Sequence, residues 1–501
     1  MKGFVIGATG SGTGKTTISL AILSYLADLG YTVAPFKVGP DFIDPGHHAK
    51  IAGKTSFNLD SWMLSKAYNT RIFNENAKGA DIAVVEGVMG LFDGYDGLSE
   101  SGSTAQMAKW LDLPVVLIVS AKGKARSAAA IVKGFETFDK DLKIAGVIFS
   151  KTGSLRHYEY LKKAVEQSCT TKCLGFMPRN ESIVMPERHL GLVTSDELNI
   201  SKKVLFTLTS MVRDHIDIKG LIHSLNSFDA IDSADSLGKI EPQKDVHGLE
   251  QGPTIAIARD KAFCFYYQDN IDILKKFGAK IIEFSPLNDG NLPPDIDGIY
   301  FGGGYPEVYA RELSQKTELL KEIKNKSIAG MPIYAECGGF MFLCNTLCAM
   351  DPIQKYPMSG CFNFNVQMSK RLRSLGYREI TLKKDTIIGK KGYVLRGHEF
   401  HYSSIETQKP ETQKPETKNL EAQNREAQNL ANQKPANQKN NIPDVYSVTS
   451  RAGQDLTLKG YQVNNTLGSY LHVHFGSNPE CAKHFVDTCK SFKDKNVTQN
   501  A

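Results

Sequence analysis

The first 180 residues alternate short apolar runs with longer amphipathic stretches. Each apolar run is bounded by Gly, Pro, Asp or Ser, which is typical of buried strands that end in turns. Residues 16–29, between the first two runs, have the apolar spacing of a helix. This alternation predicts a parallel sheet covered by helices on both faces. The predicted strands are Phe4–Ala8, Thr32–Val38, Ile82–Glu86, Pro114–Ser120, Ile144–Phe149 and Cys173–Met177.

The pattern changes after about Asp217. Residues 224–252 are rich in Asp, Ser, Gly, Pro and Gln and hold few large apolar side chains, so we interpret them as a linker between domains. A second alternation of strands and helices follows the linker. The predicted fold class is therefore α/β with two domains, which suits a chain of 501 residues. The predicted strands of the second domain are Thr254–Ala258, Lys280–Phe284, Gly298–Phe301 and Pro332–Ala335.

Residues 406–441 form a polar insertion within the second domain. ETQKP occurs twice there, EAQN and ANQK recur, and no aromatic residue lies between Tyr402 and Tyr446. Such a segment buries too little apolar surface to offset the entropy of ordering it. We predict a disordered insertion without chemistry, and the alternative is a segment that binds a partner.

Composition and charge exclude several classes of protein. The formal charge of +6 is small for this length and comes with no dense Lys/Arg stripe, so no nucleic-acid partner is expected. No stretch approaches the roughly 18 apolar residues of a membrane helix. The nine cysteines are odd in number in a long chain, which argues against a disulfide framework. We expect a cytoplasmic protein with no membrane partner, and a homodimer stays open.

A glycine-rich loop follows the first predicted strand. The sequence ATGSGTGKTT at 8–17 is a variant of the phosphate-loop pattern, with Thr9 where the strict motif has Gly. Its backbone N–H groups, the following helix N-terminus and a lysine would bind the phosphates of ATP. The expected nucleotide-binding residues are Gly12, Gly14, Lys15, Thr16, Thr17 and Lys37.

Carboxylates follow two other predicted strands. Asp41 comes after the second strand and Glu86 ends the third. Because the carboxyl ends of parallel strands meet at one edge of a sheet, we expect Thr16, Asp41 and Glu86 to share one Mg²⁺ ion. Each acid alone could equally be an ordinary loop carboxylate or cap. Asp93, just past Glu86 in GLFDG, is a candidate substrate residue or a turn residue before Gly94.

A candidate nucleophile lies in the second domain. Cys337 directly follows the strand PIYAE and is followed by two glycines and a predicted helix. A nucleophile at such a strand–helix turn is exposed at the sheet edge, and a helix N-terminus should lower its pKa. His472 and His474 are the candidate bases, far downstream as a Cys–His arrangement allows. Gly303 and Gly304, after another strand, are the candidate oxyanion-hole donors. The His398–His401 segment has the spacing H-E-x-H, which does not match the zinc motif.

Taken together, these motifs resemble the cobyrinic acid a,c-diamide synthase family, which is also called the cobyrinate a,c-diamide synthase family. The resemblance spans nearly the whole chain apart from the linker and the insertion. The motifs are GTGKTT at 12–17, PFKVGPDFIDPGHH at 35–48, NLDSWML at 58–64, VVEGVMGLFDG at 84–94, MPERHLGLV at 185–193, FGGGYPE at 301–307, AECGGFMFL at 335–343, GHEFHYS at 397–403 and SYLHVHFGSNP at 469–479.

The resemblance implies a P-loop, dethiobiotin-synthetase-like domain over 1–223 and a class I-type glutamine amidotransferase domain over 253–495. It implies ATP-dependent amidation of the c and a carboxylates of a tetrapyrrole acid in cobalamin biosynthesis, through acyl phosphates, with ammonia from glutamine. Cys337 takes the nucleophile role and His472 the base role. Family acids that handle metal, ATP and substrate correspond to Asp41, Glu86 and Asp93, beside the substrate position Phe42.

Three positions depart from the family pattern. Phe42 stands where relatives with GPDYIDP have Tyr, and Ser150 stands where many relatives have an Asn associated with the purine. Position 474 is His, so the His-x-Glu pattern of many class I domains is absent and what orients His472 stays open. Two related substrates, hydrogenobyrinic acid and nickel-sirohydrochlorin, stay open as well. From another class, a partitioning or switch ATPase with a non-catalytic second domain is the alternative.

Overall fold

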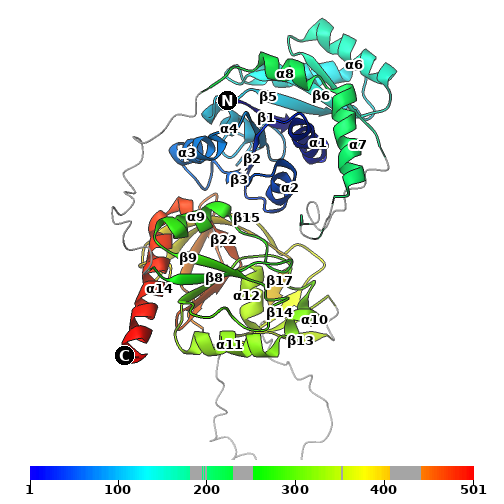
Figure 1. The fold of residues 1–501 in the computed structure, drawn as a ribbon. Coiled ribbons are helices and arrows are strands. Elements are labelled where there is room, and N and C mark those ends of the chain that lie inside the picture. The colour runs from blue at the N-terminus through cyan, green and yellow to red at the C-terminus, as the bar shows by residue number, and fades with distance from the viewer. Residues whose placement is uncertain are drawn as a thin grey trace, which may run out of the picture.

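The computed structural model describes residues 1–180, 194–195, 197, 200–228, 252–350, 354–406 and 442–500. Most of the predicted linker, nearly all of the 406–441 insertion and the MPERHLGLV motif lie outside these residues. Figure 1 shows two α/β parts, one above the other, with the N-terminal part in blue to green and the C-terminal part in green to red.

The N-terminal part is built on a seven-stranded sheet in the order β3-β2-β4-β1-β5-β6-β7, and its strands pair in parallel. The strands are β1 (Lys2–Ala8), β2 (Val33–Val38), β3 (Phe57–Leu59), β4 (Ile82–Glu86), β5 (Val115–Ser120), β6 (Ile144–Thr152) and β7 (Cys173–Pro178). The helices are α1 (Lys15–Asp28), α2 (Ile43–Ala52), α3 (Lys66–Ala77), α4 (Thr104–Trp110), α5 (Ser127–Phe138), α6 (Leu155–Ser168), α7 (Lys202–His215) and α8 (Ile218–Ser224).

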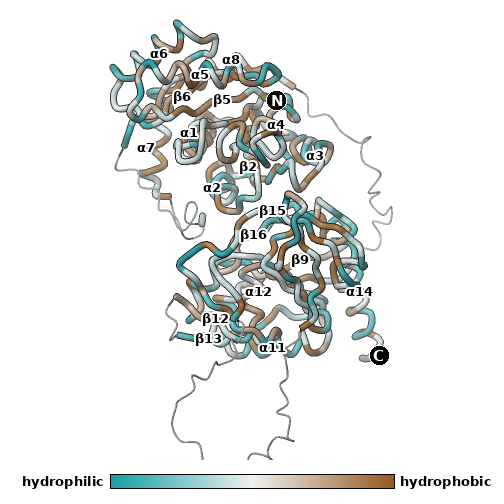
Figure 2. The backbone as a smooth tube through the Cα atoms, turned by 180° about the vertical axis from the view of Figure 1, so that it is seen from behind, coloured by the Kyte–Doolittle hydropathy of each residue, from teal (hydrophilic) through white to brown (hydrophobic). Residues whose placement is uncertain are grey.

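Helices cover both faces of this sheet, as the sequence predicted. One buried cluster joins α1 and α7 to the strands, through side chains such as Leu26 and Leu208. The cluster on the other face joins α3, α4, α5 and α6 to the same strands, through side chains such as Ile72 and Leu161. Burial on both faces explains the near-continuous apolar runs of the strands, which are brown in Figure 2 at β5 and β6. All six predicted strands are confirmed, and only the short β3 was missed.

The C-terminal part contains a six-stranded sheet in the order β20-β21-β11-β10-β8-β9, parallel except for the β20–β21 pair. Its four predicted strands are confirmed as β8 (Thr254–Ala258), β9 (Lys280–Phe284), β10 (Gly298–Phe301) and β11 (Ile333–Glu336). The others are β20 (Gly460–Val463) and β21 (Thr466–Ser469). Its helices are α9 (Gln268–Lys276), α10 (Ala310–Ser314), α11 (Thr317–Ile328), α12 (Gly338–Leu343), η2 (Phe475–Ser477) and α14 (Pro479–Asn500).

Two further sheets were not predicted. The four-stranded sheet has the order β13-β12-β14-β17 and the five-stranded antiparallel sheet the order β19-β18-β15-β16-β22. Their strands carry many charged and polar residues, so they lack the apolar signal of a buried parallel strand. They are β12 (Cys344–Cys348), β13 (Lys355–Pro357), β14 (Phe362–Met368), β15 (Ser374–Leu382), β16 (Val394–His401), β17 (Ser403–Ile405), β18 (Tyr446–Ser450), β19 (Asp455–Leu456) and β22 (Leu471–Val473).

The two parts meet through buried side chains. In both views α2 lies beside β15, where the parts face each other. The hydroxyl of Tyr377 in β15 donates to Asp60 Oδ2 at 2.6 Å, and the hydroxyl of Tyr68 in α3 donates to Asp269 in α9. Buried polar groups need such partners, so these bonds fix how the two parts are oriented.

Candidate active sites

The phosphate loop has the geometry that anion binding requires. Gly12 and Gly14 adopt φ angles of 70° and 92°, in the left-handed region that a glycine enters without a Cβ clash. Gly14 caps α1, so the loop leads directly into a helix N-terminus. Ser150 donates to the carbonyl of Thr13, and Lys151 Nζ donates to that of Gly12 at 2.6 Å. These bonds tie the loop to the end of β6.

Acidic side chains gather beside the loop, around the ammonium of Lys37. Glu86 Oε1 lies 2.9 Å from Lys37 Nζ and accepts from the Thr16 hydroxyl at 2.8 Å. Asp44, which the sequence analysis did not assign, pairs with Lys37 and lies 3.3 Å from the Thr16 hydroxyl. Asp41 Oδ2 lies farther out, 3.7 Å from Lys37 Nζ. Thr16 and Glu86 therefore meet as expected, whereas Asp44 takes the inner place expected for Asp41.

The charges of this cluster hold one another in place. Burial opposes charge on Lys37, but Asp44, Glu86 and Asp41 outweigh it and raise the pKa of the ammonium above its ordinary value. Burial likewise opposes charge on Glu86, but Lys37 and a 2.8 Å contact with His48 Nε2 hold its pKa well below the usual range. Asp44 and His48 are four residues apart on α2, so they share one helix face. That spacing was the signal in the sequence that could have found both.

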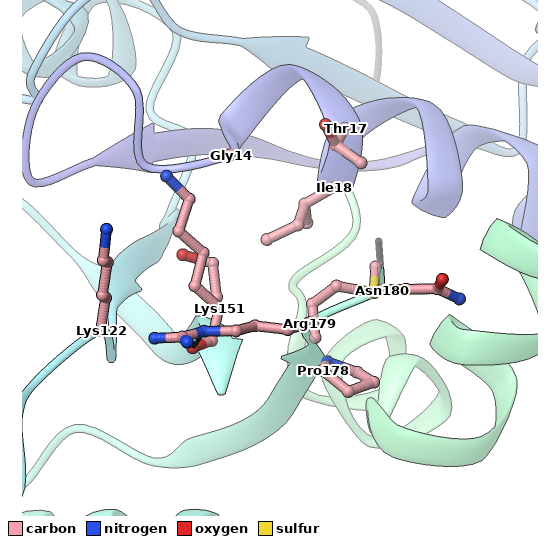
Figure 3. Close-up of a pocket in the computed structure, with 10 residues that line it drawn as sticks. Gly14, Thr17, Ile18, Lys122, Lys151, Pro178, Arg179 and Asn180 are labelled. Carbon is pink, nitrogen blue, oxygen red and sulfur yellow. Dashed lines mark hydrogen bonds between the residues drawn. The ribbon is translucent and has the colours of Figure 1, made fainter. Parts of the chain in front are cut away.

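A cavity of about 440 Å³ opens beside the phosphate loop (Figure 3). The side-chain nitrogens of Lys122, Lys151 and Arg179 gather on one side of it, and Ile18 and Pro178 supply apolar surface. It combines apolar walls with a few polar groups, as small-molecule sites do. Its lining residues are Gly14, Thr17, Ile18, Lys122, Ser150, Lys151, Met177, Pro178, Arg179 and Asn180.

Asp93 has a local partner. Its carboxylate accepts a 3.0 Å hydrogen bond from the backbone N–H of Gly90, and its own N–H donates to the Gly90 carbonyl at 3.0 Å. The residue is exposed. Of the two roles that the sequence left open, this geometry favours the turn residue.

Cys337 occupies the sharp strand–helix turn that its sequence predicted. Its φ of 43° and ψ of −103° are strained for a residue with a side chain. The thiol donates to the carbonyl of Phe400 at 3.8 Å and is buried. The expected lowering of its pKa is wrong: burial, with a smaller effect of Glu307, raises the pKa of the Cys337 thiol. The helix that follows is only six residues long, so its dipole does not compensate for the lost solvation.

The two candidate bases differ in their surroundings. His474 Nδ1 accepts from the Gly476 N–H at 3.1 Å and caps η2, which is a structural role. His472 lies in β22 directly opposite His398 of β16, and the two rings stack with centroids 4.8 Å apart. Burial, and then His398, lower the pKa of His472, so its imidazole is neutral as a general base requires. The geometry therefore favours His472 over His474.

β16 connects the imidazole to the thiol. His398 faces His472, and the carbonyl that accepts the Cys337 thiol belongs to Phe400, two residues further along β16. The hydrogen bonds of the described residues include none between Cys337 and His472. Such catalytic bonds often form only when substrate is bound.

The glycine loop at 302–304 packs against both catalytic candidates. A Cβ at Gly303 would lie 2.3 Å from Cε1 of His472, and a Cβ at Gly338 would lie 3.0 Å from the Gly304 nitrogen. The Gly303 N–H already donates to the Phe265 carbonyl at 3.2 Å. Of the two predicted oxyanion donors, Gly303 therefore already has an acceptor within the protein, so Gly304 is the candidate that we carry forward.

The GHEFHYS motif forms an ion-pair network. Glu399 Oε2 accepts from Arg378 Nε at 2.8 Å, and Glu399 Oε1 lies 2.7 Å from His401 Nε2. His398 contacts the hydroxyl of Tyr267 at 2.9 Å. The motif thus supports the wall of the thiol site.

Phe42 links the phosphate site to the thiol site by direct ring contacts. It follows Asp41 directly, and its ring lies 5.0 Å from the ring of His472. It also stacks on Phe265 at 5.3 Å and lies 4.6 Å from Tyr267. The phosphate site and the thiol site are therefore joined by one aromatic side chain.

The fold and these two sites define a class: a glutamine amidotransferase domain joined to a P-loop nucleotide-binding domain. Residues 4–193 match the family described as the CobQ/CobB/MinD/ParA nucleotide binding domain, and residues 254–480 match the CobB/CobQ-like glutamine amidotransferase domain. No helix in the described ranges is both long and apolar enough to span a bilayer.

Full-length relatives narrow this class. The chain is 38% identical to the cobyrinate a,c-diamide synthase of Leptospira interrogans, covering 97% of this chain and 98% of that protein. It is 40% identical to the cobyrinate a,c-diamide synthase of Dehalococcoides mccartyi, over 97% of this chain and 98% of that protein. With that of Salmonella typhimurium it shares 39% identity over 96% of this chain and 97% of that protein. The chain belongs to the cobyrinate a,c-diamide synthase family.

Proposed function

We propose that this protein amidates the a and c carboxylates of cobyrinic acid, using ATP and ammonia released from glutamine, in cobalamin biosynthesis. The single observation that carries the proposal is the contact of Phe42 with His472, because it joins a phosphate site to a thiol site within one chain. The names of the full-length relatives support cobyrinic acid as the substrate. Reaction in the cytosol would give access to both ATP and glutamine.

In the amidotransferase domain, Cys337 Sγ would attack the side-chain amide carbon of glutamine while His472 takes the thiol proton. The negative oxygen of the tetrahedral adduct would accept the Gly304 N–H. The carbon–nitrogen bond then breaks, and His472 returns the proton to the nitrogen, so that ammonia leaves. Water hydrolyses the remaining thioester to glutamate and restores the thiol.

In the nucleotide-binding domain, an oxygen of the substrate carboxylate would attack the γ-phosphorus of ATP, and ADP would leave. Ammonia then attacks the carbonyl carbon of the acyl phosphate, and inorganic phosphate leaves as the amide forms and a proton is lost. Lys15 and Lys37 would offset the charge that builds up on the phosphates. The cavity beside Gly14 is suited to the base and ribose of the nucleotide.

Magnesium fits the donor atoms of the acidic cluster. Thr16, Asp44 and Glu86 would supply oxygen ligands, and Asp41 lies at the edge of the same cluster. The described residues include no set of three or more His, Cys, Asp or Glu that could hold a metal by themselves. Phosphate oxygens and water would complete the coordination, as is usual for Mg²⁺ in ATP sites. Bound there, it would neutralise phosphate charge during transfer.

Two assays test the proposal. Purified protein with ATP, glutamine and cobyrinic acid should yield a monoamide and then a diamide, detected by mass spectrometry. Parallel reactions with hydrogenobyrinic acid and nickel-sirohydrochlorin separate the related substrates, and exclusive use of either would overturn the assignment to cobyrinic acid. A partitioning or switch ATPase would hydrolyse ATP without producing glutamate from glutamine, so a glutaminase assay excludes or supports that class.

A further inference from the structure

A buried carboxylate lies directly beside the candidate base. Glu336 ends β11, immediately before Cys337, and is 1% exposed. Its Oε1 accepts from the Tyr334 hydroxyl at 2.8 Å and from the Val473 N–H at 3.0 Å. Its Oε2 accepts from the Tyr300 hydroxyl at 3.1 Å. These three donors hold the carboxyl group in one orientation.

His472 lacks a partner on the side that faces this carboxylate. Its Nδ1 is buried and makes no hydrogen bond with any described residue. Glu336 Oε2 lies 3.9 Å from that nitrogen. The ring faces are already covered, since Phe42 and His398 pack against the imidazole. Among the described groups, Glu336 is therefore the acid placed to receive the Nδ1–H.

We propose that Glu336 positions His472 for catalysis: its Oε2 accepts the Nδ1–H of the imidazole, leaving Nε2 free to take the proton of the Cys337 thiol. This inference rests on the glutaminase half of the proposed function. A carboxylate at Nδ1 selects the tautomer with a basic Nε2 and stabilises the imidazolium once the proton has moved. In this chain, that carboxylate comes from the residue before the nucleophile, because position 474 is His.

A second buried histidine–carboxylate pair, His474 and Asp269, can be compared with His472 and Glu336. His474 Nε2 is also buried without a hydrogen bond in the described structure, and Asp269 Oδ2 lies 3.8 Å away. However, Asp269 accepts from Tyr68 across the domain boundary, and His474 Nδ1 is used to cap η2. This second pair is similar in chemistry and burial but supports the domain contact instead of the thiol.

The charge state of Glu336 makes its role dependent on pH. Burial raises its pKa to about 8, while the hydrogen bonds from Val473 and the two tyrosines oppose that shift. Its ability to orient the imidazole should therefore increase as pH rises through about 8. The titratable groups whose pKa responds to the charge of Glu336 are Tyr266, Tyr267, Tyr300, Tyr334, Tyr446 and Cys337. The charged or titratable groups that act on the pKa of His472 are His398, His401 and Glu399, and Glu399 is already paired with Arg378 and His401.

The decisive variant is Glu336→Gln, which keeps the size of the side chain and removes its charge. We expect kcat for glutamine hydrolysis to fall roughly 10²–10⁴-fold with little change in KM, by analogy with loss of the orienting carboxylate in a catalytic triad. Amidation from added ammonium should stay within about twofold, since it does not use the thiol. The ratio of wild-type to variant glutaminase rates should grow between pH 6 and pH 9.

The control is Asp269→Asn, which should lower glutaminase activity far less and by a factor that does not change with pH. A wild-type kcat in Glu336→Gln, or an equal loss of both the glutamine and the ammonium reactions, would overturn the proposal. The ¹⁵N shifts of His472, assigned by their loss in His472→Gln, give a readout independent of activity. In the wild-type protein these shifts should show that the neutral imidazole carries its proton on Nδ1. A proton on Nε2 of the wild-type imidazole would also overturn the proposal. Absence of glutaminase activity in the wild type would instead refute the proposed function.

Discussion

The ring of Phe42 in the nucleotide-binding domain lies 5.0 Å from the ring of His472 in the amidotransferase domain. Asp41 precedes Phe42 directly and lies 3.7 Å from Lys37, so one dipeptide contacts both candidate sites. This contact offers a physical path for matching ammonia release to carboxylate activation.

We predict that Phe42→Ala uncouples the two reactions, so that several glutamines are hydrolysed for each amide formed. The truncation removes the ring that contacts His472, Phe265 and Tyr267. It should also destabilise the protein by about 1–3 kcal/mol, less than for a fully buried Phe. The measurement is the ratio of glutamate to amide. Phe42→Tyr keeps the ring and serves as the control, and an unchanged ratio in a folded Phe42→Ala protein would contradict this coupling.

We predict that Cys337→Ser abolishes glutamine-dependent amidation and preserves amidation from concentrated ammonium at alkaline pH. The thiol would serve only to release ammonia, and a hydroxyl is too weak a nucleophile to replace it. Amide formation from each nitrogen source is measured by mass spectrometry. If a stably folded variant lost both activities, Cys337 would have another role.

We predict that Lys15→Ala and Glu86→Gln each abolish amidation from either nitrogen source. Lys15 belongs to the phosphate loop, and Glu86 contacts Thr16, Lys37 and His48 in the acidic cluster. Losses of 10³-fold or more are typical when a phosphate-clamping charge is removed. Glutaminase activity is the control and should persist. Near-normal amidation with ammonium would remove these residues from the ATP site.

The sequence predicted the parts of this molecule whose signals are local. The phosphate loop, Cys337 and the ten parallel strands each follow from a continuous motif or an apolar run. The spacing of Asp44 and His48 places both on one face of α2, but that this face lies against Lys37 and Glu86 depends on how α2 packs on the sheet, so both residues were missed. Glu336 looked like the last residue of a strand, and only the pairing of β11 and β22 with their neighbours brings it near His472.

The sign of the thiol pKa shift was wrong for a related reason. A strand–helix turn predicts stabilisation of a thiolate, but how deeply the turn is buried depends on neighbours from elsewhere in the chain, such as Phe400 of β16. The antiparallel strands around β16 were missed because their alternation of buried and exposed residues is irregular. Packing between residues far apart in the sequence therefore determines both where the antiparallel strands form and in which direction the pKa of Cys337 shifts.

Glu336 also predicts how stability depends on pH. Its pKa of about 8 in the folded protein lies above the ordinary value of 4.5, so folding retains a proton that the unfolded chain releases. The free energy of unfolding should therefore fall as pH rises from 4.5 to about 8, with a contribution of up to about 1.4 kcal/mol per pH unit from this group. Urea unfolding at several pH values should give a shallower fall for Glu336→Gln. An equal fall in both proteins would contradict the raised pKa.

The last prediction concerns Asp93, where the sequence left a substrate role and a turn role open. The carboxylate accepts from the Gly90 N–H at 3.0 Å, and the same two residues are joined by a second backbone bond of 3.0 Å. A Cβ at Gly90 would lie 2.3 Å from Asp93 Oδ2, so the turn closes tightly around the side chain. We therefore expect Asp93→Ala to destabilise the protein by roughly 1 kcal/mol through loss of this hydrogen bond.

In the turn role, both amidations should slow equally or not at all. In a substrate role, Asp93→Asn should slow one amidation more than the other, and the monoamide should accumulate. A time course of monoamide and diamide, with a melting curve for each variant, separates the two. A lowered melting temperature with an unchanged product ratio supports the turn. Accumulated monoamide at an unchanged melting temperature would instead return Asp93 to the substrate site, because the Gly90 bond alone cannot distinguish the two carboxylates of the substrate.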